Sequence, residues 1–174
     1  NVANSANNSG GVLSAANNLK LIAANAALSN QAGSIRANGA LSLNTASIDN
    51  TSGKIGNNAG TGGSVSIQTG TLANQNGAIG SGQDLSLNAA TLTGDGSIVA
   101  GRNGSVTLGS DYTQTATNKL HANGDLNFTT SGKFTNQGVL DANGALTVNA
   151  TNVENQAGAD LNSATTTVNA NGGT

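Results

Sequence analysis

The chain of 174 residues contains no Cys, Met, Trp or Pro and 8% charged residues, with a formal net charge of -2. Without cysteine there is no disulfide framework and no thiolate zinc site, and one histidine, His121, cannot build a histidine metal cluster. Six scattered Lys and Arg residues neutralise too few phosphates for nucleic-acid binding, and no apolar run approaches the ~20 residues of a membrane span. The length suits one domain over residues 1–174. Because no Lys/Arg-led signal peptide opens the sequence, we expect a chain that is either cytosolic or cut from a longer precursor.

Apolar residues separated by one polar residue recur along the chain. The steps between successive pairs are 22, 24, 20, 21, 20, 20 and 20 residues. A fixed interval of this size is typical of solenoid repeats, and we place the clear repeats at about residues 8–170. The pairs are Leu19/Leu21, Leu41/Leu43, Val65/Ile67, Leu85/Leu87, Val106/Leu108, Leu126/Phe128, Leu146/Val148 and Thr166/Val168.

Two further apolar positions follow each pair and complete the unit. The alternation within each segment has a period of two, which indicates short strands with one buried face. Asn-Gly steps and an Asn-x-x-Gly spacing separate the segments, and these residues suit tight corners. The second positions are Leu28, Ile48, Leu72, Leu92, Tyr112, Phe134 and Val153, and the third are Ile35, Ile55, Ile79, Ile98, Leu120, Leu140 and Leu161.

A unit of about 20 residues with three short strands cannot bury its own apolar side, whereas stacked units can. The sequence therefore predicts an all-β parallel β-solenoid of about eight coils, roughly 35–40 Å long at one strand spacing of ~4.8 Å per coil. We expect an interior of Leu, Ile, Val and Ala without ionisable groups. The Ala-rich stretch 19–28 has fair helix propensity, but its phase favours a strand. Gly60–Gly63 is interpreted as the insertion that lengthens one coil.

Polar residues that alternate with the apolar pairs are expected to form ladders on the outer surface. Hydroxyl and amide side chains in register can bond to their copies in the next coil, which explains the Asn-rich composition without any ligand. One ladder comprises Ser42, Ser66, Ser86, Thr107, Asn127, Thr147 and Thr167, and the other Asn44, Gln68, Asn88, a break at Gly109, Thr129, Asn149 and Asn169.

Units of the form Asn-Gly-x-Leu-x-Leu-x-Ala-x-x-apolar-x-Asn-x-x-Gly-x-Ile-x-Ala resemble the haemagglutinin repeats of filamentous haemagglutinin-like exoproteins. That family includes two-partner-secretion adhesins and contact-dependent growth inhibition toxins. The resemblance implies a right-handed parallel β-helix, exported through an outer-membrane transporter and displayed on a Gram-negative surface. Because the Asn-Pro-Asn signatures of the secretion domain are absent, we expect an interior segment of a longer fibre.

Tyr112 and Phe134 are the candidate ligand or adhesion residues. They replace the usual aliphatic residue at the second position on two adjacent coils. If the rings are exposed, they form a platform on which a sugar stacks, and if they are buried they belong to the core.

Charged residues were also compared in register. Asp84 and Asp125 share a phase two coils apart, a separation that suits an inverting glycosidase, but each lies beside a Gly-rich corner and is interpreted as a solvated turn residue. His121 and Asp141 should stack on neighbouring coils as a surface ion pair. Asp111 and Lys133 predict a similar pair.

These patterns favour a structural stalk segment of a secreted adhesin or toxin-delivery exoprotein, which holds distal binding or toxic domains away from the cell. The alternative is direct adhesion to a host or neighbour-cell glycan or receptor. We predict no enzymatic activity, because uniform coils leave little room for a cleft. No metal or cofactor is expected, since the acidic residues do not cluster. An ice-binding face would require a regular Thr-x-Thr array. Expected partners are the rest of the fibre, the transporter, and further copies through exposed strand edges at the ends.

Overall fold

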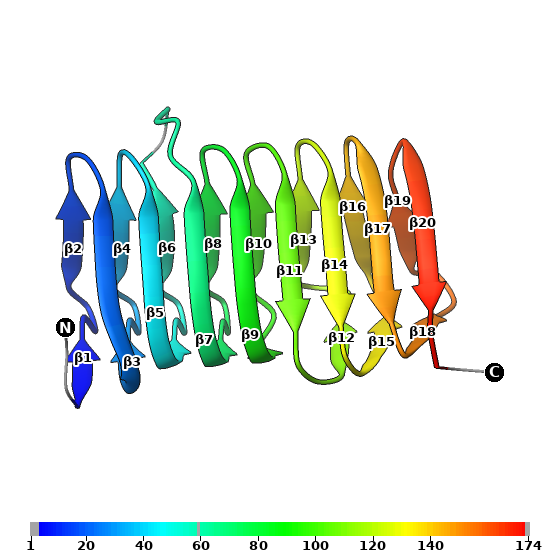
Figure 1. Ribbon diagram of the computed structural model, residues 1–174, viewed down its shortest axis with the longest axis horizontal. Helices are drawn as coiled ribbons and strands as arrows, with labels where there is room; N and C mark the ends of the chain where they lie inside the picture. The colour runs from blue at the N-terminus through cyan, green and yellow to red at the C-terminus, as the bar shows by residue number, and fades with distance from the viewer. Residues whose placement is uncertain (1–3, 59, 173–174) are drawn as a thin grey trace.

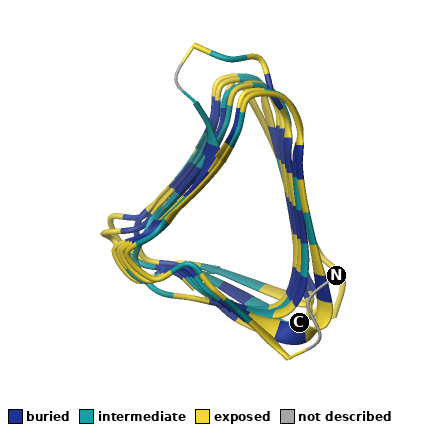
Figure 2. Ribbon diagram, turned by 90° about the vertical axis from the view of Figure 1, so that its left-hand side faces the viewer, coloured by how far each residue is buried: buried dark blue, intermediate teal, exposed yellow. Residues whose placement is uncertain are grey.

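The computed structural model describes residues 4–58 and 60–172, which form a parallel β-solenoid of about eight turns (Figure 1). In Figure 1 the front strands run downward and the rear strands upward while the coils advance from left to right, so the winding is right-handed. Seen along its axis, each coil is a triangle, and buried residues occur along all three of its sides (Figure 2). Over the described residues, none of the chain forms a helix suited to crossing a membrane.

Two long sheets form two sides of the triangle. Sheet A contains β1 (Ser5–Asn7), β3 (Leu19–Ser29), β5 (Leu41–Asp49), β7 (Val65–Ala73), β9 (Leu85–Thr93), β11 (Gly104–Leu108), β14 (Leu126–Thr130), β17 (Ala145–Ala150) and β20 (Thr165–Ala170). Sheet B contains β2 (Val12–Ala15), β4 (Ser34–Ala37), β6 (Lys54–Asn57), β8 (Ala78–Ser81), β10 (Ser97–Ala100), β13 (Lys119–Ala122), β16 (Val139–Ala142) and β19 (Asp160–Asn162).

The third side differs between the two halves of the solenoid. From β3 to β9 the strand of sheet A bends around the corner and carries the second apolar position itself, as β5 carries Ile48. Later coils break at that corner and form sheet C, with β12 (Tyr112–Gln114), β15 (Lys133–Asn136) and β18 (Asn152–Asn155). The coil thus has the predicted three sides, but the earlier coils achieve this with two strands.

The strand register confirms the repeat most clearly in sheet B. Its third apolar positions pair without interruption from Leu13 through Ile35 to Leu161. The Ala-rich stretch is strand β3, as its phase predicts. Side chains from all three sides meet in one continuous apolar core, whose burial is the main source of stability in such stacks.

The register predicted for the fifth coil is wrong by two residues. Val106 pairs with Leu87 and Phe128, while Gly104 occupies the position opposite Leu85 and Leu126. A Cβ at Gly104 would lie 2.9 Å from Leu126 Cδ1, so the Leu126 side chain fills the space that a larger residue would need. Consequently Ser105 replaces Thr107 in the first outer ladder, and Thr107 fills the expected break in the second.

The expectation of a purely aliphatic interior without ionisable groups is also wrong. Asn30, Asn50 and Asn74, which stand at the Asn-x-x-Gly corners, are at most 1% exposed and their side chains point inward. Each amide donates to the next, with N–O distances of 2.7 Å from Asn30 to Asn50 and 2.8 Å from Asn50 to Asn74. Because every amide is both donor and acceptor, the ladder satisfies buried polar groups that would otherwise be costly. Among the described residues, Tyr112 is the ionisable residue in the core.

Candidate binding surface

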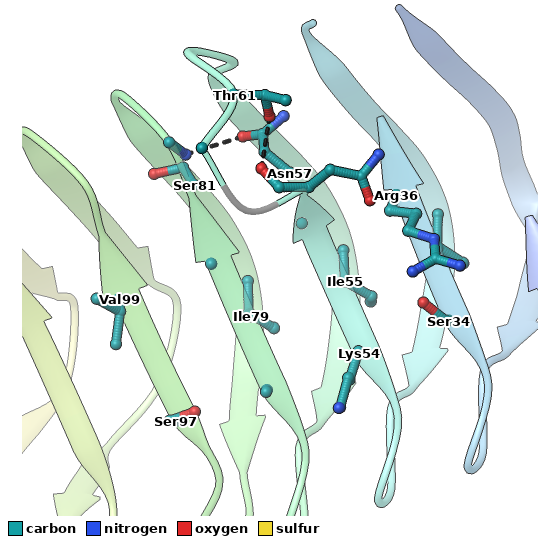
Figure 3. A pocket seen from close by; sticks show the side chains of 17 residues that line it. Ser34, Arg36, Lys54, Ile55, Asn57, Thr61, Ile79, Ser81, Ser97 and Val99 are labelled. Carbon is teal, nitrogen blue, oxygen red and sulfur yellow. Dashed lines mark hydrogen bonds between the residues drawn. The ribbon is translucent and has the colours of Figure 1, made fainter. Parts of the chain in front are cut away.

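A groove of about 620 Å³ lies on the outer face of sheet B, across β4, β6, β8 and β10. Two rows of outward-facing positions line it, each row running along the solenoid axis. One row holds Ser34, Lys54, Ala78 and Ser97, and the other holds Arg36, Gly56, Gly80 and Val99. Small residues in both rows leave the floor low, and Figure 3 shows the side chains that surround it.

Glycines form the lowest part of this floor. A Cβ on Gly56 would lie 2.1 Å from the carbonyl oxygen of Gly80, so any side chain there would force the two backbones apart. At Gly80 a Cβ would meet nothing nearer than the Val99 carbonyl oxygen at 3.8 Å. The hollow above Gly80 is therefore open space that a side chain could occupy.

The insertion between β6 and β7 overhangs one side of the groove, and Figures 1 and 2 show it projecting from an otherwise uniform stack. Asn57 anchors its base. Asn57 Oδ1 accepts from the Gly82 amide at 3.0 Å (Figure 3), and Asn57 Nδ2 donates to the Gly39 carbonyl at 2.7 Å in the preceding coil. The predicted insertion is thus confirmed as a loop tied to the coils on either side.

Two exposed cations, Arg36 and Lys54, stand at one end of the groove on neighbouring strands (Figure 3). None of the described residues that line the groove carries a carboxylate. Among the described residues neither cation forms an ion pair, whereas Arg102, His121 and Lys133 each contact a carboxylate. The groove is therefore locally positive on a chain whose net charge is negative.

Tyr112 and Phe134 do not form an exposed platform. Tyr112 is 5% exposed and Phe134 is fully buried, and with Phe128 they form an aromatic cluster with ring centroids 4.8 to 6.3 Å apart. Both rings follow the inward phase of sheet C, where they pair in register. The core alternative is therefore correct, and these residues present no ring face for a ligand.

The hydroxyl of Tyr112 is enclosed by amides. It donates to Gln114 Oε1 and accepts from Asn118 Nδ2, both at 3.0 Å. Burial raises the pKa of Tyr112 to about 12, against the smaller opposing effect of the Asn118 hydrogen bond. The phenol therefore stays neutral at physiological pH and is part of the packing.

His121 and Asp141 lie side by side on β13 and β16, as predicted. His121 Nδ1 is 2.7 Å from Asp141 Oδ2, and His121 Nε2 is 2.9 Å from Asn123 Oδ1. Both ring nitrogens are occupied by surface partners, which fits the interpretation as an ion pair and leaves no nitrogen directed at a reacting group.

Asp84 and Asp125 serve as turn residues. Asp84 accepts from the backbone amide of Asn103 at 3.2 Å, and Asp125 accepts from that of Ala145 at 2.8 Å. Hydrogen bonding from the Arg102 guanidinium holds the pKa of Asp84 below its usual value. Each carboxylate therefore connects one coil to the next.

The predicted side-chain pair between Asp111 and Lys133 is wrong. Asp111 instead accepts from the backbone amide of Lys133 at 2.7 Å, and the Lys133 ammonium pairs with Glu154 in the following coil. Hydrogen bonding from Lys133 lowers the pKa of Glu154. In the paired strands Lys133 lies opposite Asn152, and Glu154 lies two residues further along β18. Residues two apart on a strand point to the same face, so the ammonium reaches the Glu154 carboxylate diagonally.

Sequence reasoning did not identify the groove. Its signal was present, since two consecutive coils carry glycine at an outward position of sheet B where other coils carry Arg36, His121 or Asp141. Within the described residues, no three His, Cys, Asp or Glu side chains gather as a metal site would require.

Comparison with known proteins places the repeat in a family context. A family model described as "Haemagglutinin repeat" matches residues 1–26 and 21–62. The tRNA nuclease CdiA-2 of Burkholderia pseudomallei (strain 1026b) is 36% identical over 131 residues, which is 75% of this chain. The chain spans 4% of the length of that relative. No solved structure gave a significant match.

Proposed function

We propose, from the premise that this chain is a repeat region of the filamentous haemagglutinin type, that it is a rigid stalk segment of a secreted bacterial exoprotein. In this role the segment supplies length and stiffness, and it holds distal binding or toxic domains away from a Gram-negative surface. The activity named for the relative belongs to that whole protein, of which the similar stretch is a small part.

One observation carries the proposal: sheet A continues in parallel register from β1 to β20 across nine strands. Each coil contacts its neighbours on all sides through the core, so bending the rod would open apolar surface along one sheet. A rod built this way gains about 4.8 Å for every coil. The number of repeats therefore determines the length of the rod.

The composition suits export through an outer-membrane transporter. A chain without cysteine cannot be trapped by disulfides in an oxidising compartment. Each coil contacts only its neighbours in sequence, so folding can proceed coil by coil as the chain emerges. The transporter and the remaining coils of the fibre are the partners that this role requires, and exposed strand edges at the ends suit stacking on further coils.

A segment exchange tests the proposal. In the full-length exoprotein, these 174 residues would be replaced by an equal number of coils from an unrelated haemagglutinin-repeat stretch, and surface display and delivery to target cells would be measured. A stalk predicts that both are retained, because only length and stiffness matter. Loss of delivery with normal display would contradict it.

A second exchange acts as the control for length. Replacement by half the number of coils should shorten the projection of a distal epitope from the cell surface in proportion. If the projected distance does not change with the number of coils, the segment is not a spacer.

A further inference from the structure

We propose that the groove on sheet B binds an acidic oligosaccharide, with Arg36 and Lys54 as the anion-binding residues. This goes beyond a stalk role, which requires no ligand. The groove also differs in place and chemistry from the aromatic surface expected from the sequence.

Charge is the first argument. Arg36 and Lys54 lie on adjacent strands, and register places Ser34 opposite Lys54 and Gly56 opposite Arg36. Two cations on adjacent strands, with no ion-pair partner among the described residues, repel each other, and a bound anion relieves that repulsion. The planar guanidinium can hold a carboxylate or sulfate through two parallel hydrogen bonds, while the ammonium adds a point charge.

The shape of the groove is the second argument. It crosses four strands, from β4 to β10, which is roughly 14 Å along the axis at one spacing of ~4.8 Å per strand. The low floor at Gly56 and Gly80 allows a linear chain to lie along the axis against the backbone. The overhanging loop, with Asn58 and Thr61 among the lining residues, closes one side.

The lining favours a sugar over a protein partner. Ser34 and Ser97 accept hydrogen bonds from Asn8 and Asn74 through their backbone carbonyls. Among the described residues no hydrogen bond involves their hydroxyls, which line the groove and can reach ligand hydroxyls. Protein interfaces centre on buried aromatic or large apolar anchors, and Val99 is the largest apolar side chain facing the groove, with partial exposure. All three aromatic rings are in the core.

Because no ring is available for stacking, charge and hydrogen bonds carry the recognition. Binding should therefore weaken as ionic strength rises, since exposed charges are screened. Single contacts of this kind are weak, and many stalks displayed on one cell would compensate by multivalency.

The test is calorimetric titration of the chain with three short oligomers: a galacturonic acid trimer, a sulfated maltotriose and unmodified maltotriose. We expect the acidic oligomers to bind and the neutral one not to bind. Whichever acidic oligomer binds more tightly identifies the anion as carboxylate or sulfate. Binding of neither acidic oligomer, or equal binding of the neutral one, would overturn the proposal.

Three variants locate the site. Arg36→Gln and Lys54→Gln should each raise Kd about tenfold, the usual consequence of losing one charge-assisted hydrogen bond. Lys20→Gln removes the same charge from an exposed position on β3, outside the groove, and should leave Kd unchanged. An equal loss in all three would indicate non-specific attraction and refute the assignment.

Gly80→Thr tests the groove without altering charge. The new side chain enters open space, and a β-branched residue suits a strand, so circular dichroism and the melting temperature should show an intact fold. Binding should be lost because the floor is filled, and retention of binding would place the ligand elsewhere. These outcomes leave the stalk proposal untouched, because that proposal depends on length and not on this surface.

Discussion

Replacing Asn50 by alanine removes the middle of the buried amide ladder. The Asn50 side chain is fully buried. It accepts from Asn30 at 2.7 Å and donates to Asn74 at 2.8 Å and to the Gly53 carbonyl at 3.3 Å. Three hydrogen bonds are lost, each worth about 1 kcal/mol net, and Asn74 Oδ1 is left buried without a donor at a further cost of about 1–3 kcal/mol. We predict that Asn50→Ala lowers the free energy of unfolding by about 4–6 kcal/mol.

Urea denaturation followed by far-ultraviolet circular dichroism measures this loss. The matched control is Asn88→Ala, because Asn88 is an exposed amide on the outside of β9. Its removal should change the free energy of unfolding by no more than about 0.5 kcal/mol. If Asn50→Ala costs less than about 1 kcal/mol, or costs no more than Asn88→Ala, the interior amides do not stabilise the stack and the reasoning is wrong.

Three further predictions concern single positions. Gly56→Ala should lower the melting temperature, at a cost of about 1–3 kcal/mol, because its Cβ meets the Gly80 carbonyl, whereas Gly80→Ala should be neutral or stabilising; equal melting temperatures would contradict this. Tyr112 has a pKa raised to about 12 when folded and about 10 when unfolded, so its contribution is complete below pH 10 and lost as the pH rises to 12. Relative to Tyr112→Phe, the native chain should therefore lose about 3 kcal/mol across that interval in denaturation titrations, and parallel alkaline profiles would refute this. His121→Ala should change the free energy of unfolding by less than about 1 kcal/mol near neutral pH. A larger loss would show that the contacts of His121 with Asp141 and Asn123 stabilise the fold more than a surface ion pair does.

The repeat could be predicted because its strongest signal is a fixed interval between large apolar residues. The isoleucine and leucine ladder of sheet B follows directly from that interval. The register of the fifth coil was not predicted correctly because Gly104 has no apolar side chain. The pair at Val106 was therefore aligned with Leu85, although Val106 pairs with Leu87. A core position occupied by glycine and filled by Leu126 from the next coil leaves no apolar mark in the sequence.

Polar residues were harder to assign to the inside or the outside. The sequence pattern of an Asn at a corner fits a solvent-exposed turn residue and a buried amide equally well. Only the stacked structure shows that Asn30 donates a hydrogen bond to Asn50. Tyr112 and Phe134 posed the opposite problem, since their period fits the core but aromatic rings also suit ligands. The groove exists because Gly56 and Gly80 have no side chains and because the insertion loop overhangs one side. The position of that loop over the glycines cannot be predicted from the order of residues.

The coils stack into a straight, rigid rod with a constant rise, and distances between spin labels test this geometry most directly. Thr167 would be labelled together with Lys20, seven strands away in sheet A, or with Ser66, five strands away. At ~4.8 Å per strand the account predicts separations of roughly 34 and 24 Å between backbones, each with a narrow distribution. Broad distributions, or two pairs whose mean distances do not differ by about two strand spacings, would contradict it.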